Sequence, residues 1–272
     1  MIRRCPTSCA LALALSLVVG ATACGSDKKS TTTSTRTAGT ASKSPARASG
    51  SITVFAAASL TESFDDEKSD LRTADPDLSI RCNFAGSGAL VTQVKQGAPA
   101  DVIATADTAS MKKLTDAGLV EKPSIFARNN LEILVAPGNP KGIHRLADLA
   151  RRDVKLVLED DTVPAGRYSA KALKNAGVTV HPVSREADVK SAVAKVTSGE
   201  ADATVVYVSD VKAAGSKGSG VEIPAAQNVT AEYPIAVVKA TKNHAAAAAF
   251  VDAIVNGTGQ AALETHGFLP AT

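Results

Sequence analysis

The chain is poor in aromatic residues and in cysteine. Aromatic residues make up 3% of its 272 residues, and tryptophan is absent. Three of the four cysteines, Cys5, Cys9 and Cys24, lie in the first 24 residues. Cys82 stands alone in the rest of the chain, which excludes an internal disulfide framework there. It lies in an alternating apolar run, which favours a small buried side chain.

The chain also lacks a basic domain, although its formal net charge is +3. Residues 1–50 hold seven of the 30 Lys and Arg residues and one of the 27 Asp and Glu residues. The segment from residue 51 onward is consequently net negative, at −3. A nucleic-acid-binding domain needs a basic surface, and aromatic side chains commonly stack on bases. We therefore expect no nucleic-acid partner.

Metal-binding motifs are missing from the sequence as well. The four histidines are His144, His181, His244 and His266. Neither they nor the carboxylates fall at the spacings of a metal site. We expect no directly ligated metal ion.

The first 24 residues have the pattern of a bacterial signal peptide. Arg3 and Arg4 precede an apolar run from Ala10 to Val19, which is too short to span a membrane as a helix. The closing residues ATAC (21–24) resemble a lipobox, which implies that Cys24 is lipidated and anchors the mature chain to the outer face of the cell membrane. Alanine at position 21 departs from the leucine preferred there, so cleavage with free secretion remains the alternative.

Residues 25–50 consist mostly of Ser, Thr, Ala, Lys and Gly and contain no large apolar residue. Such a composition does not bury enough surface to order the chain, which predicts a disordered tether. A flexible coil of about 25 residues has a reach of roughly 25–30 Å. The tether would therefore hold a folded domain close to a membrane surface.

From residue 51 onward, short extended segments alternate with helical patterns, which predicts an α/β fold with mainly parallel sheets. The expected strands are 51–57, 78–85, 101–105, 131–137, 156–159, 204–208 and 234–239. The expected helices are 60–72, 88–96, 109–117, 145–151, 166–175, 188–197 and 245–256. Two apolar segments, 131–137 and 232–238, are candidates for crossover hinge strands. They predict lobe I at 51–131 and 233–272, and lobe II at 132–232.

At four places where a strand or loop leads into an expected helix, small residues lie nearby. They are AAAS (56–59), GSG (86–88), PAG (164–166) and DV (188–189). The start of a helix presents unpaired N–H groups and the positive end of the helix dipole, which together favour an anion. Small residues allow the backbone to approach a ligand, and Ser59 and Ser87 can each donate both an N–H and an O–H.

Each junction also has an ordinary structural explanation. Ser59 is a candidate helix N-cap, and Glu62 three residues later would complete a capping box. The GSG segment is compatible with a simple turn, and the other two junctions with plain helix starts. Tyr207 fits a half-buried aromatic residue of a sheet. Taken singly, these patterns do not identify a function.

Taken in order, seven stretches resemble the periplasmic molybdate-binding proteins of ABC importers, which are type II solute-binding proteins. The stretches are ITVFAAASLT (52–61), FAGSG (84–88), GAPADVIATAD (97–107), VPAG (163–166), EADVK (186–190), VYVSD (206–210) and EYPIAV (232–237). The resemblance implies a two-lobed, periplasmic-binding-protein-like α/β fold. Each lobe would be a mainly parallel sheet flanked by helices, and the lobes would close on a tetrahedral oxyanion.

The resemblance also implies the binding residues. Ser59 and Ser87 would donate side-chain and backbone hydrogen bonds from lobe I. Ala165 and Val189 would donate backbone N–H groups from lobe II, and Tyr207 its phenolic O–H. The ligand, molybdate or tungstate, would be held through its oxygens, with no other cofactor. Hydrogen bonds to a charged group contribute about 1.5–3 kcal/mol each, so neutral donors suffice for a dianion.

Selectivity follows from the absence of acceptors in such a site. Phosphate carries a proton near neutral pH, so a pocket without a carboxylate would reject it. Sulfate has the shape and charge of molybdate, and a sulfate-binding protein with a smaller cavity is the alternative function. We expect Arg167, which directly follows the PAG turn, to face solvent.

A hydrolase is the alternative from a different class, with Ser59 or Ser87 as nucleophile. No histidine lies near either serine in the sequence, so the base that such a nucleophile requires is not evident. We therefore expect a binding protein and not an enzyme. As the receptor of an importer, it would act as a monomer that docks on ABC permease subunits.

Overall fold

The computed structural model describes residues 50–272. The predicted signal peptide (1–24), the lipidation of Cys24 and nearly all of the predicted tether (25–50) lie outside the described residues. Among residues 50–272, every helix falls short of the length and apolar character that a membrane span requires.

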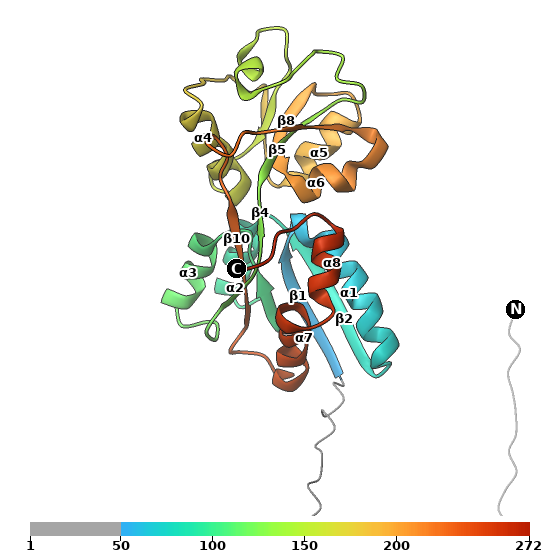
Figure 1. The fold of residues 1–272 in the computed structure, drawn as a ribbon. Coiled ribbons are helices and arrows are strands. Elements are labelled where there is room, and N and C mark those ends of the chain that lie inside the picture. Colours follow the sequence, from blue (N-terminus) through green and yellow to red (C-terminus); the bar gives the residue numbers. More distant parts are fainter. Residues whose placement is uncertain (1–49) are drawn as a thin grey trace, which may run out of the picture. The chain divides into compact units, whose positions relative to one another are not determined.

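The first sheet has five strands in the order β2-β1-β3-β10-β4 (Figure 1). Its strands are β1 (Gly50–Ala57), β2 (Leu78–Ala85), β3 (Val102–Ala104), β4 (Ser124–Asn129) and β10 (Ala231–Val237). The helices around it are α1 (Thr61–Ala74), α2 (Ser87–Lys95), α3 (Thr108–Asp116), α7 (His244–Asn256) and α8 (Gly259–Thr265). We call the part of the molecule built on this sheet lobe I.

Strand side chains in lobe I alternate between two cores. Ile52 and Val54 of β1 share a core with residues of α1 and α7, whereas Phe55 shares the other core with residues of α2 and α3. Figure 1 shows α2 and α3 on one side of the sheet and α1, α7 and α8 on the other. Successive strand residues point to opposite faces, so a strand that is covered on both faces has an uninterrupted apolar sequence. Cys82 of β2 is half-buried against the first core, and burial raises the pKa of its thiol to about 11.

The second part of the molecule, lobe II, contains a three-stranded sheet and a two-stranded sheet, in the orders β8-β5-β9 and β6-β7. The strands are β5 (Leu131–Val135), β6 (Val157–Glu159), β7 (Ser184–Glu186), β8 (Ala203–Tyr207) and β9 (Ser219–Glu222). The helices are α4 (Pro164–Asn175), α5 (Val189–Thr197) and α6 (Val208–Ala214), with 3-10 helices at Leu146–Ala150 and Gly215–Lys217. A parallel bridge between Leu156 and Ala203 links the two sheets.

The predicted α/β class, with helices that flank the sheets, is confirmed, but the expectation of mainly parallel sheets is wrong. The β1–β2, β1–β3 and β6–β7 pairs are parallel, whereas every pairing of β5 and β10 is antiparallel. The last residues of β1, β6 and β8 lie where the two lobes meet. The strands β5 and β10 carry the chain away from this junction, so they run opposite to strands that end there. The precise lobe boundaries, 51–131 with 233–272 and 132–232, stay a prediction.

Six of the nine aromatic residues form one connected cluster behind this junction. Its members are Phe64, Phe126, Tyr207, Tyr233, Phe250 and Phe268. Tyr233 of β10 packs edge-on against Tyr207 of lobe II at 5.7 Å between ring centroids, and against Phe126 of lobe I at 6.3 Å. The cluster therefore fixes the position of Tyr207 relative to the core of lobe I.

Candidate functional site

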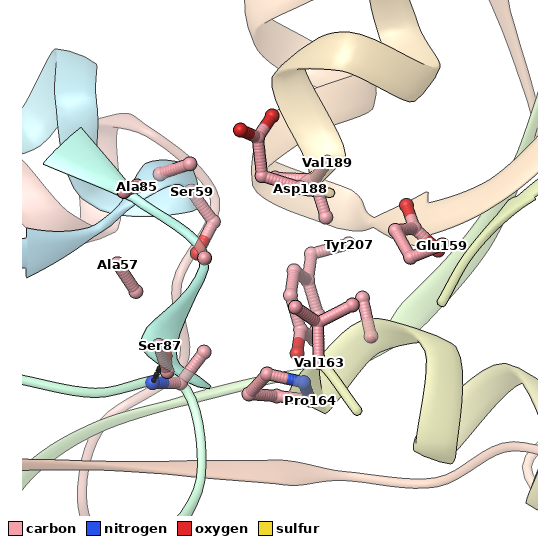
Figure 2. A pocket seen from close by; sticks show the side chains of 14 residues that line it. Ala57, Ser59, Ala85, Ser87, Glu159, Val163, Pro164, Asp188, Val189 and Tyr207 are labelled. Atoms are coloured by element: carbon pink, nitrogen blue, oxygen red, sulfur yellow. Dashed lines mark hydrogen bonds between the residues drawn. The ribbon is translucent and has the colours of Figure 1, made fainter. Parts of the chain in front are cut away.

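A small cavity lies between the two lobes, and all five predicted binding residues line it. Its walls are Ala57, Ala58, Ser59, Ala85, Gly86, Ser87, Ala106, Glu159, Val163, Pro164, Ala165, Asp188, Val189 and Tyr207. Figure 2 shows Ser59 and Ser87 on one side, and Val189, Tyr207 and Pro164 facing them from lobe II. The cavity encloses about 20 Å³, and a single water needs about 10–15 Å³.

Four helical segments begin at this cavity. The 3-10 helix Ala58–Leu60 follows β1 and leads into α1, and α2 follows β2. From lobe II, α4 begins at Pro164 and α5 at Val189. No side chain caps the 3-10 helix, α2 or α4, so the first N–H groups of these segments have no capping partner. The cavity therefore receives the positive ends of several helices, which favours an anion.

Both serines are buried and are oriented by neighbouring groups. Ser59 Oγ lies 3.0 Å from the hydroxyl of Tyr233. Ser87 Oγ accepts a hydrogen bond from the backbone N–H of Ala106 at 3.0 Å, which leaves its own proton free to be donated. The N-cap explanation for Ser59 is wrong, because Ser59 lies inside the 3-10 helix and the residue before α1 is Leu60.

Tyr207, the last residue of β8, is 1% exposed and not the half-buried sheet residue that the alternative explanation assumes. Its hydroxyl makes no hydrogen bond of standard geometry among the described residues, although it lies close enough to the hydroxyl of Tyr233 to lower the pKa of that phenol. Burial raises the pKa of this phenol well above its usual value. The group is therefore a neutral donor at the cavity wall, and a buried hydroxyl without a partner costs free energy until something accepts its proton.

The cavity wall contains carboxyl groups, so the premise that the pocket lacks a carboxylate is wrong. Glu159 ends β6 and is fully buried, and Asp188 caps α5 by accepting a hydrogen bond from the N–H of Ser191 at 2.8 Å. Burial is the main cause that raises the pKa of Glu159 to about 8. Sequence reasoning missed Glu159, because an acidic residue beside the acidic turn 160–161 gives no signal of burial.

Glycine at position 86 allows the lobes to approach. A Cβ atom at Gly86 would lie 2.5 Å from the carbonyl oxygen of Ala187 and 2.9 Å from Val163 Cγ1, both in lobe II. Contacts below 3.0 Å require the structure to shift. The side chain that Gly86 lacks would therefore hold the two lobes apart.

Two ion pairs join the lobes beside the cavity. The guanidinium of Arg167, on α4, pairs with Asp107, which also caps α3. Arg167 is not among the residues that line the cavity, but the expectation that it faces solvent is wrong, since it bridges to lobe I. Lys190 of α5 pairs with Glu62 of α1 at 2.7 Å. The cationic side chains at the junction thus neutralise carboxylates and leave the cavity to neutral donors.

Comparison with known proteins defines the class. The family described as bacterial extracellular solute-binding protein matches residues 52–269. The chain is 38% identical over 253 residues to the molybdate-binding protein ModA of Mycobacterium tuberculosis. The aligned region covers 93% of this chain and 94% of the relative. This chain therefore belongs to the bacterial extracellular solute-binding proteins, which places it outside the cytoplasm.

Solved structures show the same fold. The periplasmic molybdate-binding protein of Azotobacter vinelandii superposes on this chain with a TM-score of 0.71 at 20% sequence identity. The superposed region covers 80% of this chain and 98% of the Azotobacter chain. The sulfate-binding protein SubI of Mycobacterium tuberculosis also has a TM-score of 0.71 at 20% identity, and the superposed region covers 81% of this chain and 86% of the SubI chain. These likenesses support the two-lobed solute-binding fold and do not distinguish the two anions.

Proposed function

We propose that this protein captures molybdate in the cavity between its lobes and delivers it to the permease of an ABC importer. The observation that carries the proposal is the convergence of Ser59, Ser87, Ala165, Val189 and Tyr207 on one cavity. Identity of 38% to a molybdate-binding protein over nearly the whole chain supports the choice of anion. Tungstate, which has the same shape and charge, would bind in the same way.

The donors account for the affinity without a cationic side chain. Ser59 and Ser87 would each donate an N–H and an O–H, Ala165 and Val189 an N–H each, and Tyr207 its O–H. Such bonds contribute about 1.5–3 kcal/mol each, and micromolar binding requires about 8 kcal/mol. Seven such bonds total about 10–21 kcal/mol, so the upper part of this range meets the requirement once several kcal/mol for association and closure are subtracted. The oxyanion is held through its oxygens, so the metal atom needs no direct protein ligand.

The site favours binding over catalysis. The hydroxyl of Ser59 pairs with Tyr233, and that of Ser87 with a backbone N–H. No histidine is among the described residues that line the cavity, so neither serine has an evident base. Solute-binding proteins generally have no enzymatic activity, and we extend this to the present chain.

The N-terminal segment would set where in the cell the protein acts. Lipidation at Cys24 would anchor the mature chain at the outer face of the membrane, and residues 25–50 would tether the two lobes to it. The protein would act as a monomer that docks on permease subunits. A single acyl chain binds membranes only weakly, so a stable anchor requires the several chains of a bacterial lipoprotein.

A thermal-shift panel with molybdate, tungstate, sulfate and phosphate tests the choice of anion. A ligand at a thousandfold excess over its Kd stabilises the folded state by about 4 kcal/mol. We expect molybdate and tungstate to raise the unfolding midpoint clearly, and sulfate much less. A shift with sulfate alone would identify a sulfate-binding protein, the alternative function that shares this fold.

A further inference from the structure

We propose that Glu159 carries a proton whenever the oxyanion is bound, so that the dianion and one proton are bound together. This inference rests on the proposed function and goes beyond the five donors on which that function depends. It assigns a role in ligand recognition to a carboxyl group that lines the cavity.

The buried position of Glu159 in the cavity wall is the first reason to expect that its carboxyl group is protonated. It is the last residue of β6, it lines the cavity, and its side chain is completely shielded from solvent. Neither carboxyl oxygen has a hydrogen-bond partner among the described residues. An ionised carboxylate without a partner is very costly in such a place, whereas the neutral acid requires only that its hydroxyl find an acceptor. An oxyanion in the adjoining cavity would act on this carboxyl group through its negative charge, which favours the neutral acid.

The acidic surroundings of Glu159 are the second reason. Glu186 of β7 lies opposite Glu159 in the strand register, Asp188 begins α5, and Asp210 lies in α6. All three carboxyl groups disfavour a negative charge on Glu159, in addition to the larger effect of burial, whereas the backbone N–H of Glu159 itself acts in the opposite direction. Burial likewise keeps the neighbouring phenol of Tyr207 neutral by raising its pKa.

The nearby cations are engaged with other groups. Lys190 pairs with Glu62 at 2.7 Å and lies 3.7 Å from Asp210, and Lys195 pairs with Glu186 at 2.6 Å. The guanidinium of Arg185 reaches the backbone carbonyl of Glu159, at 3.1 Å, and not its carboxyl group. No cation within the described structure therefore pairs with the Glu159 carboxylate, and a bound dianion would further favour its protonated form.

The sign of the pH effect follows from this arrangement. Without ligand, the pKa of Glu159 is raised to about 8, so at pH 7 the group already holds its proton. The bound dianion raises this pKa further, so binding above pH 8 takes up a proton from solution. Affinity should be constant below that pH and about tenfold lower at pH 9 than at pH 7.

Isothermal titration calorimetry with molybdate, in pairs of buffers that differ in ionisation enthalpy, measures the proton uptake directly. For the wild-type protein we expect almost no uptake at pH 7 and close to one proton per ligand at pH 9. The isosteric variant Glu159→Gln should bind without proton uptake and with the same affinity at both pH values.

Two variants serve as controls. Glu186→Gln removes a neighbouring carboxylate that does not line the cavity, and it should retain the uptake at pH 9. Asp210→Asn removes the other strongly perturbed buried acid, whose pKa is raised to about 7 mainly by burial, and it should retain the uptake as well.

Binding by the wild-type protein without proton uptake at pH 9 would overturn the inference, as would uptake that persists in Glu159→Gln. If Glu159→Gln fails to fold, a ligand-difference infrared spectrum of the wild-type protein at pH 9 provides the test. A protonated carboxyl band that is gained on ligand binding supports the inference, and the absence of such a band overturns it. Absence of molybdate binding at pH 7 would instead remove the proposed function, and this inference with it.

Discussion

At the scale of single residues, Ser87 is held as a hydrogen-bond donor. Its Oγ accepts from the N–H of Ala106, so its proton points elsewhere and is free for an oxyanion. We predict that Ser87→Ala weakens molybdate binding about 10- to 100-fold, the value of one hydrogen bond to a charged group. Ser69→Ala, on the exposed face of α1, is the matched control and should bind normally. Calorimetric affinities within twofold of each other for the two variants would contradict this role.

Tyr207 offers a test that separates binding from stability. Tyr207→Phe removes the unpartnered hydroxyl but retains the ring that packs on Tyr233. The folded protein should be as stable as the wild type or slightly more so, because a buried polar group without a partner is lost. Affinity for molybdate should nevertheless fall about tenfold or more. Thermal unfolding without ligand and calorimetry with ligand measure the two effects, and unchanged affinity would exclude Tyr207 as a donor.

Single residues also show where sequence reasoning reached its limit. Ser59 and Ser87 could be singled out because hydroxyls beside small residues at strand ends suggest a ligand, whereas Tyr207 was indicated only by the resemblance to molybdate-binding proteins. Glu159 and Tyr233 could not, because their importance depends on burial and on partners far away in the chain. Tyr233 contacts Ser59 across 174 positions, a pairing that no local pattern encodes.

At the scale of elements, the start of α2 sets how closely the lobes approach. Gly86 precedes this helix, and a methyl group there would meet the backbone of Ala187. We predict that Gly86→Ala weakens molybdate binding at least tenfold while the unfolding midpoint without ligand changes little. Gly88→Ala is a graded control, since its Cβ would lie 3.3 Å from the carbonyl oxygen of Thr162. This variant should therefore lose less affinity for molybdate than Gly86→Ala. If Gly86→Ala and the wild type bound molybdate equally well, the contact at Gly86 would not limit how closely the lobes approach each other.

Most elements with a buried apolar run were predictable, although β4 was not expected. Elements defined by their partners were not predictable. The expected strand 78–85 matches β2, and the expected helix starts near 88, 166 and 188 lie within two residues of α2, α4 and α5. The short strands β7 and β9 contain polar residues or glycine and were not expected. Their strand conformation results from pairing with β6 and β5. Tertiary context of this kind overrides local propensity.

At the scale of the whole molecule, the ion pairs between the lobes should favour the closed arrangement. Asp107 is almost fully buried, whereas Arg167 keeps about a third of its side-chain surface exposed. The pair should therefore contribute about 1 kcal/mol, between the values for exposed and buried pairs. We predict that Arg167→Met weakens molybdate binding about fivefold, and that small-angle scattering with ligand indicates a more open protein.

The surface pair of Lys112 with Asp116 lies within α3 and provides the matched control. Lys112→Met removes a cation of similar length without any effect on lobe closure, so its affinity should equal that of the wild type. If both variants lost affinity alike, the effect would reflect net charge and not a specific link between the lobes.

The proposed binding mode, in which neutral donors from both lobes hold the oxyanion without a cationic side chain, is open to direct observation. A crystal structure of the molybdate complex, with the metal located by its anomalous scattering, tests it most directly. We expect molybdate oxygens within hydrogen-bond distance of the Ser59, Ser87 and Tyr207 hydroxyls and of the Ala165 and Val189 N–H groups. A molybdate ion bound elsewhere, or one held by the guanidinium of Arg167, would contradict it.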